Sequence, residues 1–374
     1  MTDHDDFEGT PWAGEDPVRA HAETLVDWSA RVEAGDRVVV RVAEGAHDLA
    51  VAVAETLGDR GATPVFTYDS NEVSRAYARA ATADRLDEPA DDHALALYES
   101  ADVVLSLGGA RNVAAEADVP DAKRQARARG SATAREARLD TDWVSTVHPT
   151  RALAQQAGMA YEAYERFVYD AVLRDWRALA DEMQAIAERL DDAAEVRIVD
   201  ENTDLRLDIS GRVAVNSAAS VAYDSHNLPS GEVFTAPKSA DGVVTFDVPM
   251  TIENRRVREV TLRFEDGEVV EQFASEGGEA VASVLETDEG ARRLGEFGIG
   301  ANEGITRPTD SILFDEKMAG TVHLALGRAY DACVPGGTGN ESAVHVDLIR
   351  QMGEGSRLEV DGDLLQRDGA FVAP

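Results

Sequence analysis

The stretch RVVVRVAEGAHDLAVAVAETLGDRGATPVFTYD (residues 37–69) decides the fold of the first half of the chain. It opens with a short β-branched run at 37–42, which is typical of a buried strand. Residues 47–61 then follow a helical pattern that ends at Gly61, a common helix stop. A second strand is expected at 64–69. Strand, helix and strand in this order predict a βαβ unit, and hence a parallel sheet with right-handed crossovers.

The neighbouring segments continue this pattern. Residues 18–33 have the apolar spacing of a helix, and a helix at 94–101 leads into a strand at 102–107. A further strand is expected at 141–149. The glycine pair after 102–107 could cradle a phosphate. The full dinucleotide-binding glycine fingerprint and the P-loop lysine are missing, which favours an ordinary strand-to-helix turn. The first part therefore reads as doubly wound α/β.

The sequence pattern changes after a long helical region at 151–192. Downstream segments alternate apolar and polar residues between turn signals, as antiparallel strands do. A chain of 374 residues also exceeds what one hydrophobic core usually serves. We therefore expect an N-terminal doubly wound α/β domain over 1–190, with the long helical region at its C-terminal end. A C-terminal mixed α+β domain with antiparallel strands is expected over 191–374, and the candidate metal ligands described below fall within it.

The charge of the chain restricts its partners and its surroundings. The net charge is −35, from 71 acidic and 36 basic residues, and only three residues are lysines. Such a surface repels nucleic acid and anionic membranes, and it favours a halophilic protein of a high-salt cytoplasm. The acidic start lacks the apolar region of a signal peptide, and no run of 18 apolar residues occurs. A single cysteine, Cys333, provides neither a disulfide framework nor a cysteine metal cluster.

Residues 315–347 are rich in groups that can ligate a metal. His323 and His345 lie within 23 residues of each other. His345 and Asp347 would leave the same face of a strand. His323 lies in a helix-like run, in which Tyr330, two turns later, would share nearly the same face. Imidazoles, a carboxylate and a phenol together suit a divalent metal. Ordinary hydrogen-bonded histidines remain the alternative.

Two glutamates further upstream lie in glycine-containing loops or strands. Glu232 follows Gly231 in NLPSGEVFTAP (227–237), where the glycine permits a tight bend. Glu296 lies in RLGEFGIGANEGI (293–305), where glycines let the backbone approach a ligand closely. Each motif alone is weak, because a glutamate beside glycine is usually a solvated loop residue.

In this order, the motifs NLPSGEVFTAP, LGEFGIGAN, LFDEKMAGTVHLALGRAY and NESAVHVD closely resemble the thermophilic aminopeptidase T family of metallopeptidases. The resemblance covers roughly residues 20–374. It implies a metal-dependent aminopeptidase that acts on the N-termini of short peptides, with two divalent ions and a homodimeric assembly. We expect the α/β halves of such a dimer to wall off the metal sites, so that folded chains are excluded.

The resemblance also implies roles for single residues. The metal ligands would be Glu232, Glu296 as the bridging carboxylate, His323, His345 and Asp347. Tyr330 would be an active-site tyrosine that donates to the oxyanion. Apart from the resemblance, Glu316 is a possible general base, because no other unassigned glutamate is so close to the cluster, although a structural ion pair with Lys317 or an arginine is at least as good an interpretation. Val346 departs from the family pattern, where a larger aromatic residue is expected. The donor set suits Zn, Co or Mn without deciding among them.

Two other functions stay open at this point. One is a nucleotide-dependent oxidoreductase that uses the α/β half, which the missing glycine fingerprint disfavours. The other is an inactive metal-binding protein, which the complete ligand set disfavours. His226 could support the site as a hydrogen-bond partner, but a loop histidine is the simpler interpretation. His148 is expected to be structural, and no nucleophilic role is expected for Cys333.

Overall fold

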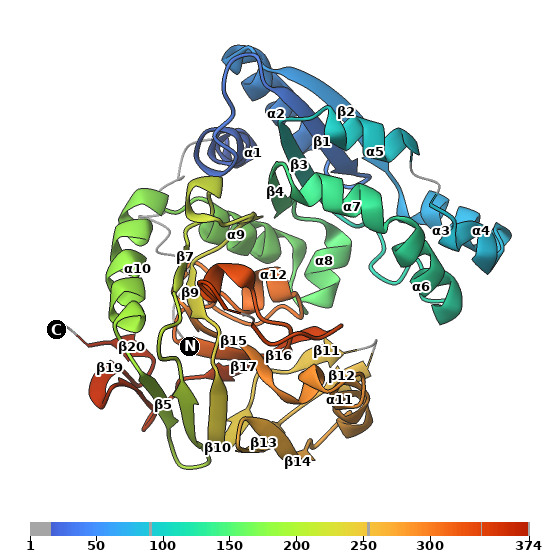
Figure 1. Ribbon diagram of the computed structural model, residues 1–374. Coiled ribbons are helices and arrows are strands. Elements are labelled where there is room, and N and C mark those ends of the chain that lie inside the picture. The colour runs from blue at the N-terminus through green and yellow to red at the C-terminus, as the bar shows by residue number, and fades with distance from the viewer. Residues whose placement is uncertain (1–15, 90–91, 253–254, 338, 373–374) are drawn as a thin grey trace. The chain divides into compact units, whose positions relative to one another are not determined.

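The computed structural model describes residues 16–89, 92–252, 255–337 and 339–372 (Figure 1). The chain forms two compact units. Unit 1 contains the residues up to 174 together with 219–229, and unit 2 contains 175–218 and 230–374. The long helical region is thus divided, because α9 (Tyr161–Val172) belongs to unit 1 and α10 (Trp176–Asp191) to unit 2. Compact units need not coincide with folding domains, so the domain limit near residue 190 stays a prediction.

Unit 1 is built on a five-stranded parallel sheet with the order β2-β1-β3-β4-β8. The predicted βαβ unit is confirmed, since α2 (His47–Arg60) connects β1 to β2 and ends at Gly61, which has a left-handed φ of 75°. Val38, Val39 and Val40 of β1 are buried, as expected for a parallel strand covered on both faces. The strands are β1 (Arg37–Ala43), β2 (Thr63–Asp69), β3 (Val103–Gly108), β4 (Asp142–Val147) and β8 (Asn227–Leu228).

Several further helices complete unit 1. They are α1 (Pro17–Glu23), the π-helix η1 (Thr24–Ser29), α3 (Asn71–Ala80), α4 (Ala83–Asp87), α5 (Asp92–Glu99), α6 (Asp121–Gly130), α7 (Ala132–Leu139), α8 (Arg151–Gln156), α9 and the 3₁₀ turn η2 (Val221–Tyr223). The predicted helical spacing at 18–33 is therefore realised as α1 followed by η1. In the described ranges, no helix combines the length and the apolar character that a membrane crossing requires.

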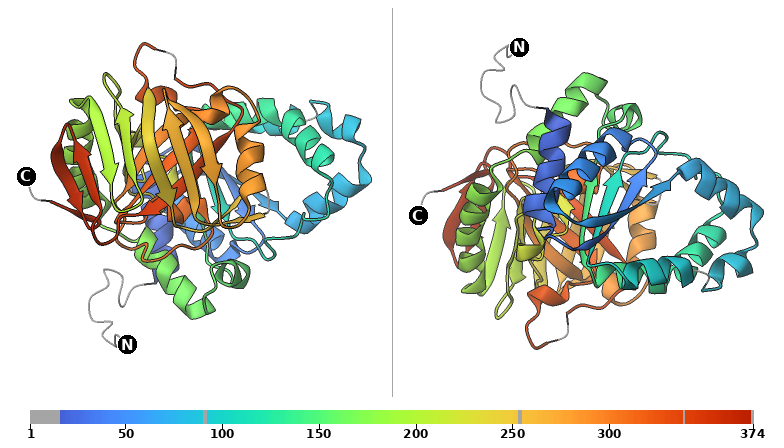
Figure 2. Two further views of the ribbon diagram at one scale, coloured as in Figure 1. Left: turned by 90° about the horizontal axis from the view of Figure 1, so that it is seen from below. Right: turned by 90° about the horizontal axis from the view of Figure 1, so that it is seen from above.

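Unit 2 contains two antiparallel sheets, as the alternating pattern predicted. The larger sheet has eight strands in the order β14-β13-β10-β6-β5-β18-β19-β20, and Figure 2 shows them side by side. Their bounds are β5 (Glu195–Val199), β6 (Asp204–Asp208), β10 (Ser239–Phe246), β13 (Val260–Glu265), β14 (Glu268–Phe273), β18 (Arg357–Val360), β19 (Asp363–Arg367) and β20 (Ala370–Phe371).

The smaller sheet of unit 2 has five strands in the order β17-β16-β15-β9-β7. Its central strands β15 and β16 are buried at every position. The strands are β7 (Val215–Ser217), β9 (Glu232–Thr235), β15 (Leu294–Gly300), β16 (Thr321–Gly327) and β17 (His345–Gln351). The rest of unit 2 consists of the ribbon β11 (Met250–Ile252) and β12 (Arg255–Val257), the helices α10, α11 (Gly278–Leu285) and α12 (Ile312–Asp315), and the turns η3 (Gly290–Arg292) and η4 (Asp331–Cys333).

One local prediction was wrong. His323 lies in the middle of strand β16, and the run TVHLALG is not helical. A strand that is buried on both faces presents a continuous apolar run instead of an alternating one, so periodicity alone cannot distinguish it from a buried helix. His323 and Tyr330 are therefore connected by a strand end and a turn, and not by two helical turns.

Candidate metal centre

The five-stranded sheet brings the five predicted ligands to one of its faces. Directly paired residues of antiparallel strands project to the same face, and residues two apart on a strand do so as well. Glu296 pairs with Ala325, which pairs with Asp347 in the next strand. His323 pairs with Gly298, two residues beyond Glu296 on β15. By the same register, Glu232 pairs with Gly300 and His345 with Gly327, so all five side chains leave the same face.

Glycine and alanine occupy the positions between these side chains on β15 and β16, namely Gly298, Gly300, Ala325 and Gly327, and they leave room for the long side chains. A Cβ on Gly298 would lie 2.1 Å from both Cε1 and Nε2 of His323, so the imidazole rests directly on the glycine backbone. A Cβ on Gly300 would lie 2.1 Å from the carbonyl oxygen of Met318. The glycines of LGEFGIG therefore form the floor of the site, because only glycine permits these contacts.

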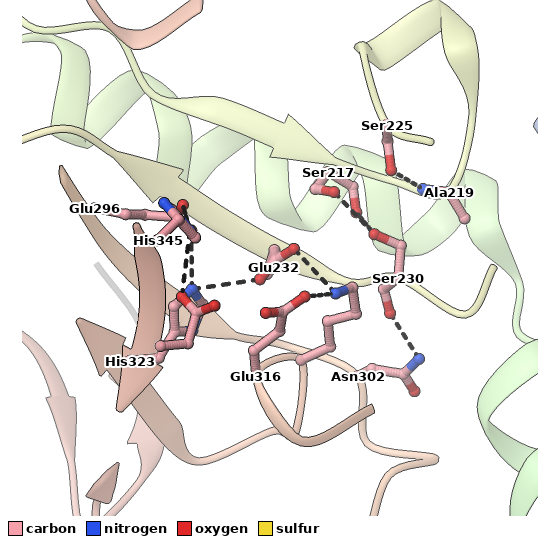
Figure 3. Close-up of polar contacts among 12 residues, drawn as sticks. Ser217, Ala219, Ser225, Ser230, Glu232, Glu296, Asn302, Glu316, His323 and His345 are labelled. Carbon is pink, nitrogen blue, oxygen red and sulfur yellow. Dashed lines mark hydrogen bonds and ion pairs between the residues drawn. The ribbon is translucent and has the colours of Figure 1, made fainter. Parts of the chain in front are cut away.

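The side chains form two triads that share Glu296. Potential ligand atoms of Glu232, Glu296 and His323 lie within 4.8 Å of one another, and so do those of Glu296, His345 and Asp347. In the first triad, His323 Nε2 is 3.0 Å from Glu296 Oε1 and 3.5 Å from Glu232 Oε2. In the second, His345 Nε2 is 3.4 Å from Glu296 Oε2 and 3.6 Å from Asp347 Oδ1. Figure 3 shows Glu232, Glu296 and the two imidazoles converging.

Unsatisfied oxygens in the cluster indicate that its residues fit divalent ions. Glu232 Oε2 and Asp347 Oδ1 are buried and have no hydrogen-bond partner within the described part of the chain. A buried carboxylate oxygen without a partner is costly, and a bound cation would satisfy it. His345 Nδ1 donates to the carbonyl oxygen of Arg328 at 2.8 Å, which leaves Nε2 facing the carboxylates. This second hydrogen bond is typical of histidines that ligate metals.

Charge coupling in the cluster is strong. Burial opposes the ionisation of Glu296, but hydrogen bonds from His323 and His345 prevail and lower its pKa to about 2. Burial also opposes protonation of the imidazoles. Their carboxylate neighbours outweigh it and raise the pKa of His323 to about 9 and that of His345 to about 11. Protons on these imidazoles therefore compensate the carboxylates in the absence of a cation, and an ion that binds there must displace them.

Lys317 contributes a buried positive charge that the sequence analysis did not assign to the site. Its side chain is fully buried, with Nζ 3.4 Å from Glu232 Oε1 and in contact with Glu316. The expected ion pair between Glu316 and Lys317 is therefore present. Burial nevertheless raises the pKa of Glu316 to about 8, although Lys317 acts in the opposite direction. The sequence feature that could have pointed to Lys317 is the rarity of lysine, which occurs at only three of 374 positions.

Tyr330 borders the second triad. Its ring centroid lies 5.0 Å from that of His345 and 5.6 Å from that of Phe234, and 49% of the residue is exposed. Partial burial and the nearby carboxylates, Glu296 first among them, raise the pKa of Tyr330. The phenol therefore stays protonated at neutral pH and can donate a hydrogen bond.

The other candidate residues are held by contacts of their own. His226 belongs to unit 1, where it stacks on Trp143 with centroids 4.5 Å apart and contacts the carbonyl oxygen of Trp143 at 2.8 Å. His148 is buried in unit 1. Asp315 is buried and accepts hydrogen bonds from Thr309 and Ser311. Cys333 packs in a small apolar cluster with Val215 and Ala329.

The nucleotide-binding alternative depends on the sheet of unit 1. In a sheet of this order, ligands bind where the strand order reverses, between the carboxyl ends of β1 and β3. There, the amide of Gly45 donates to the carbonyl oxygen of Gly109 at 2.9 Å. A Cβ on Gly45 would lie 2.3 Å from that same oxygen. The two loops are therefore in direct backbone contact at this edge of the sheet.

Comparison with known proteins identifies similar chains that are named aminopeptidases. Aminopeptidase T of Thermus thermophilus is 30% identical to this chain, over 95% of this chain and 97% of its own length. Aminopeptidase T of Thermus aquaticus is 40% identical over a shorter segment, 39% of this chain and 38% of its own. A solved structure of wild-type AmpT from Thermus thermophilus superposes with a TM-score of 0.84 and 26% identity, and covers 96% of this chain and 99% of its own.

A 2,5-dihydroxypyridine dioxygenase from Pseudomonas putida shares the fold alone, with 15% identity, a TM-score of 0.56 and 96% coverage of both chains. The fold and the relatives define a peptide hydrolase of the metal-dependent class. More particularly, the chain belongs to the family described as thermophilic metalloprotease (M29), which matches residues 15–371. The predicted family and fold class are thereby confirmed.

Proposed function

We propose that this chain is an aminopeptidase that releases N-terminal residues from short peptides with two divalent ions held by the two triads. The sharing of Glu296 between Glu232–His323 and His345–Asp347 carries this proposal, because two ions bridged by one carboxylate need such a donor set. The donors are nitrogen and oxygen only, which suits Zn, Mn or Co. The aminopeptidase names of the relatives add support.

When bound, the ions would supply Lewis acidity and a water that is deprotonated near neutral pH. The protein side chains would supply the rest. Glu296 orients both halves of the site, and the Tyr330 hydroxyl donates a hydrogen bond to the oxygen that becomes negative. Glu316 lies in the same buried acidic cluster and, in the ionised form that Lys317 favours, accepts a proton from the attacking water. Lys317 holds Glu232 and Glu316 in place through its buried ammonium group.

A free substrate amine fits this acidic environment, whereas an acylated one cannot ligate a cation. The proposed enzyme therefore cleaves unblocked short peptides and ignores N-acetylated ones. We further propose that the protein is a homodimer, as the resemblance implies, and that it is cytoplasmic. The net charge of −35 suits a high-salt cytoplasm.

The test is a panel of aminoacyl anilides and short peptides, each offered free and N-acetylated, in high salt. The protein is first stripped by a chelator and then reconstituted with Zn, Mn or Co. Cleavage of free substrates that vanishes on stripping and returns with metal is the expected result. Equal cleavage of free and acetylated peptides, or activity that ignores the chelator, would contradict the proposal.

A further inference from the structure

A cavity of about 380 Å³ opens beside the second triad of the candidate metal centre. One of its walls is β17, the edge strand of the five-stranded sheet, including His345 and Asp347. The other walls come from β11, from α11 and from the start of α12, all within unit 2 (Figure 1). The volume lies at the small end of the range for ligand pockets, roughly 300–1,000 Å³. The cavity is thus continuous with the cluster that would carry out hydrolysis.

The lining of the cavity is largely hydrocarbon. Its apolar side chains include Val248, Met250, Ile252, Val284, Ile312 and Val346. Besides Asp347, two carboxylates reach the wall, and both are engaged by neighbouring groups. Asp310 Oδ2 lies 2.9 Å from Arg256 Nη1 and also 2.9 Å from Thr251 Oγ1.

Asp315 accepts hydrogen bonds from the backbone and hydroxyl of Thr309. Together with Asp347 these carboxylates repel a further acidic group, and among the described lining residues there is no lysine or arginine to attract one. The cavity therefore suits an uncharged apolar group and disfavours aspartate and glutamate.

We infer that this cavity receives the side chain of the substrate's N-terminal residue and selects apolar residues such as leucine and methionine. This inference rests on the proposed aminopeptidase function. In that reaction the scissile carbonyl belongs to the first residue, so the side chain of that residue branches from the adjacent carbon. A carbonyl placed over the Glu296–His345–Asp347 triad puts this side chain against β17, where the cavity begins. The side chain of the second residue lies beyond the bond that breaks.

The test uses a bulky substitution at the mouth of the cavity. Ile312 is 47% exposed, so Ile312→Trp can fill the mouth without disturbing the core. Val270→Trp is the matched control, because Val270 lies on β14, is 45% exposed and does not line the cavity. Val284→Ala, a change deeper in the cavity, enlarges it and provides a second variant should the first fail to fold. All variants are compared as metal-loaded full-length chains in high salt.

The readout is kcat and KM for leucyl, methionyl, phenylalanyl, alanyl, glycyl and aspartyl anilides, together with inhibition by free leucine. A pocket discriminates by about 10-fold or more for each methylene that it accommodates. The wild type should therefore prefer leucyl to glycyl by at least that factor. Ile312→Trp should remove most of this preference through KM and weaken inhibition by leucine, with metal content unchanged. Val284→Ala should favour phenylalanyl, and Val270→Trp should match the wild type.

An unchanged leucyl-to-glycyl ratio in Ile312→Trp would overturn the inference while leaving the aminopeptidase intact. A shift confined to the second residue in alanyl-Xaa dipeptides would overturn it too. Failure of the metal-loaded wild type to cleave any substrate would instead overturn the proposed function, and the inference with it.

Discussion

The imidazole of His323 occupies the space that a Cβ on Gly298 would take, at 2.1 Å from both ring atoms Cε1 and Nε2. Gly298→Ala should therefore push His323 away from Glu232 and Glu296. We expect the affinity for divalent ions to fall by roughly 10–100-fold, the usual loss when the support of a ligand is changed. Competition titration against a chromophoric chelator measures this. Gly58→Ala is the control, since nothing lies within 4 Å of a Cβ there, and an equal loss in both variants would contradict the prediction.

Because Glu296 belongs to both triads, its substitution should affect metal binding differently from a substitution of Glu232. The wild type should bind about two divalent ions per chain. Glu296→Gln should weaken both, because its two oxygens face different histidines. Glu232→Gln should mainly loosen one, since Glu232 belongs to a single triad. Elemental analysis after dialysis against buffered metal gives the stoichiometry, and an undiminished two-ion content in Glu296→Gln would count against the bridging role.

Removal of the Tyr330 hydroxyl should slow the reaction without releasing metal. The phenol stays protonated because its pKa is raised by burial and by carboxylates. Tyr330→Phe should lower kcat by roughly 10²–10³, the usual loss for one oxyanion donor. The metal content and the melting temperature should match those of the wild type. An unchanged kcat would leave Tyr330 with only its contacts to Phe234 and His345.

A buried histidine of unit 1 predicts that stability falls in acid. His21 is fully buried, its Nε2 lies 2.7 Å from Thr146 Oγ1, and burial lowers its pKa from 6.5 to about 3. Between these values the unfolded chain binds a proton that the folded chain does not bind. Stability is therefore complete above pH 6.5 and is lost as the pH falls towards 3, by about 1.4 kcal/mol per pH unit.

Denaturant unfolding of the wild type and His21→Gln across this range measures the difference in slope. The variant should show a flatter pH dependence, although some remains because burial also lowers the pKa of His148. His93→Gln, a substitution of an exposed histidine on α5, serves as the control. Equal slopes in all three proteins would contradict the prediction.

The surface charge predicts a strong dependence of stability on salt. Arg–carboxylate pairs such as Arg37–Asp102 and Arg60–Asp27 are exposed to solvent, and such pairs contribute little to the free energy of folding. The net charge of −35 then dominates as self-repulsion. Its range shrinks from about 10 Å at 0.1 M salt to about 3 Å at 1 M. The melting temperature should rise steeply over this interval, and a flat profile would show that the repulsion is tolerated.

The sequence was informative where a pattern is local or a motif is specific. The βαβ unit at 37–69 follows from β-branched runs and a helix stop at Gly61. The candidate ligands were named from motifs, and the sheet register brings them together, although their roles stay predictions. The strand of His323 was missed because a fully buried strand lacks alternation. The strand β8 was also beyond reach, because its two residues have no periodicity and pair with β4, far away in sequence.

The buried ammonium of Lys317 makes the charges of the candidate site insensitive to dissolved salt. Dissolved ions screen the exposed charges, but they do not reach a fully buried side chain that lies against Glu232 and Glu316. The charge balance among these groups should therefore change little between dilute buffer and concentrated salt. Lowering the salt concentration should then reduce the fraction of folded molecules and leave the turnover of each folded molecule unchanged. Salt would therefore control how much active enzyme is present, and not how fast each molecule works.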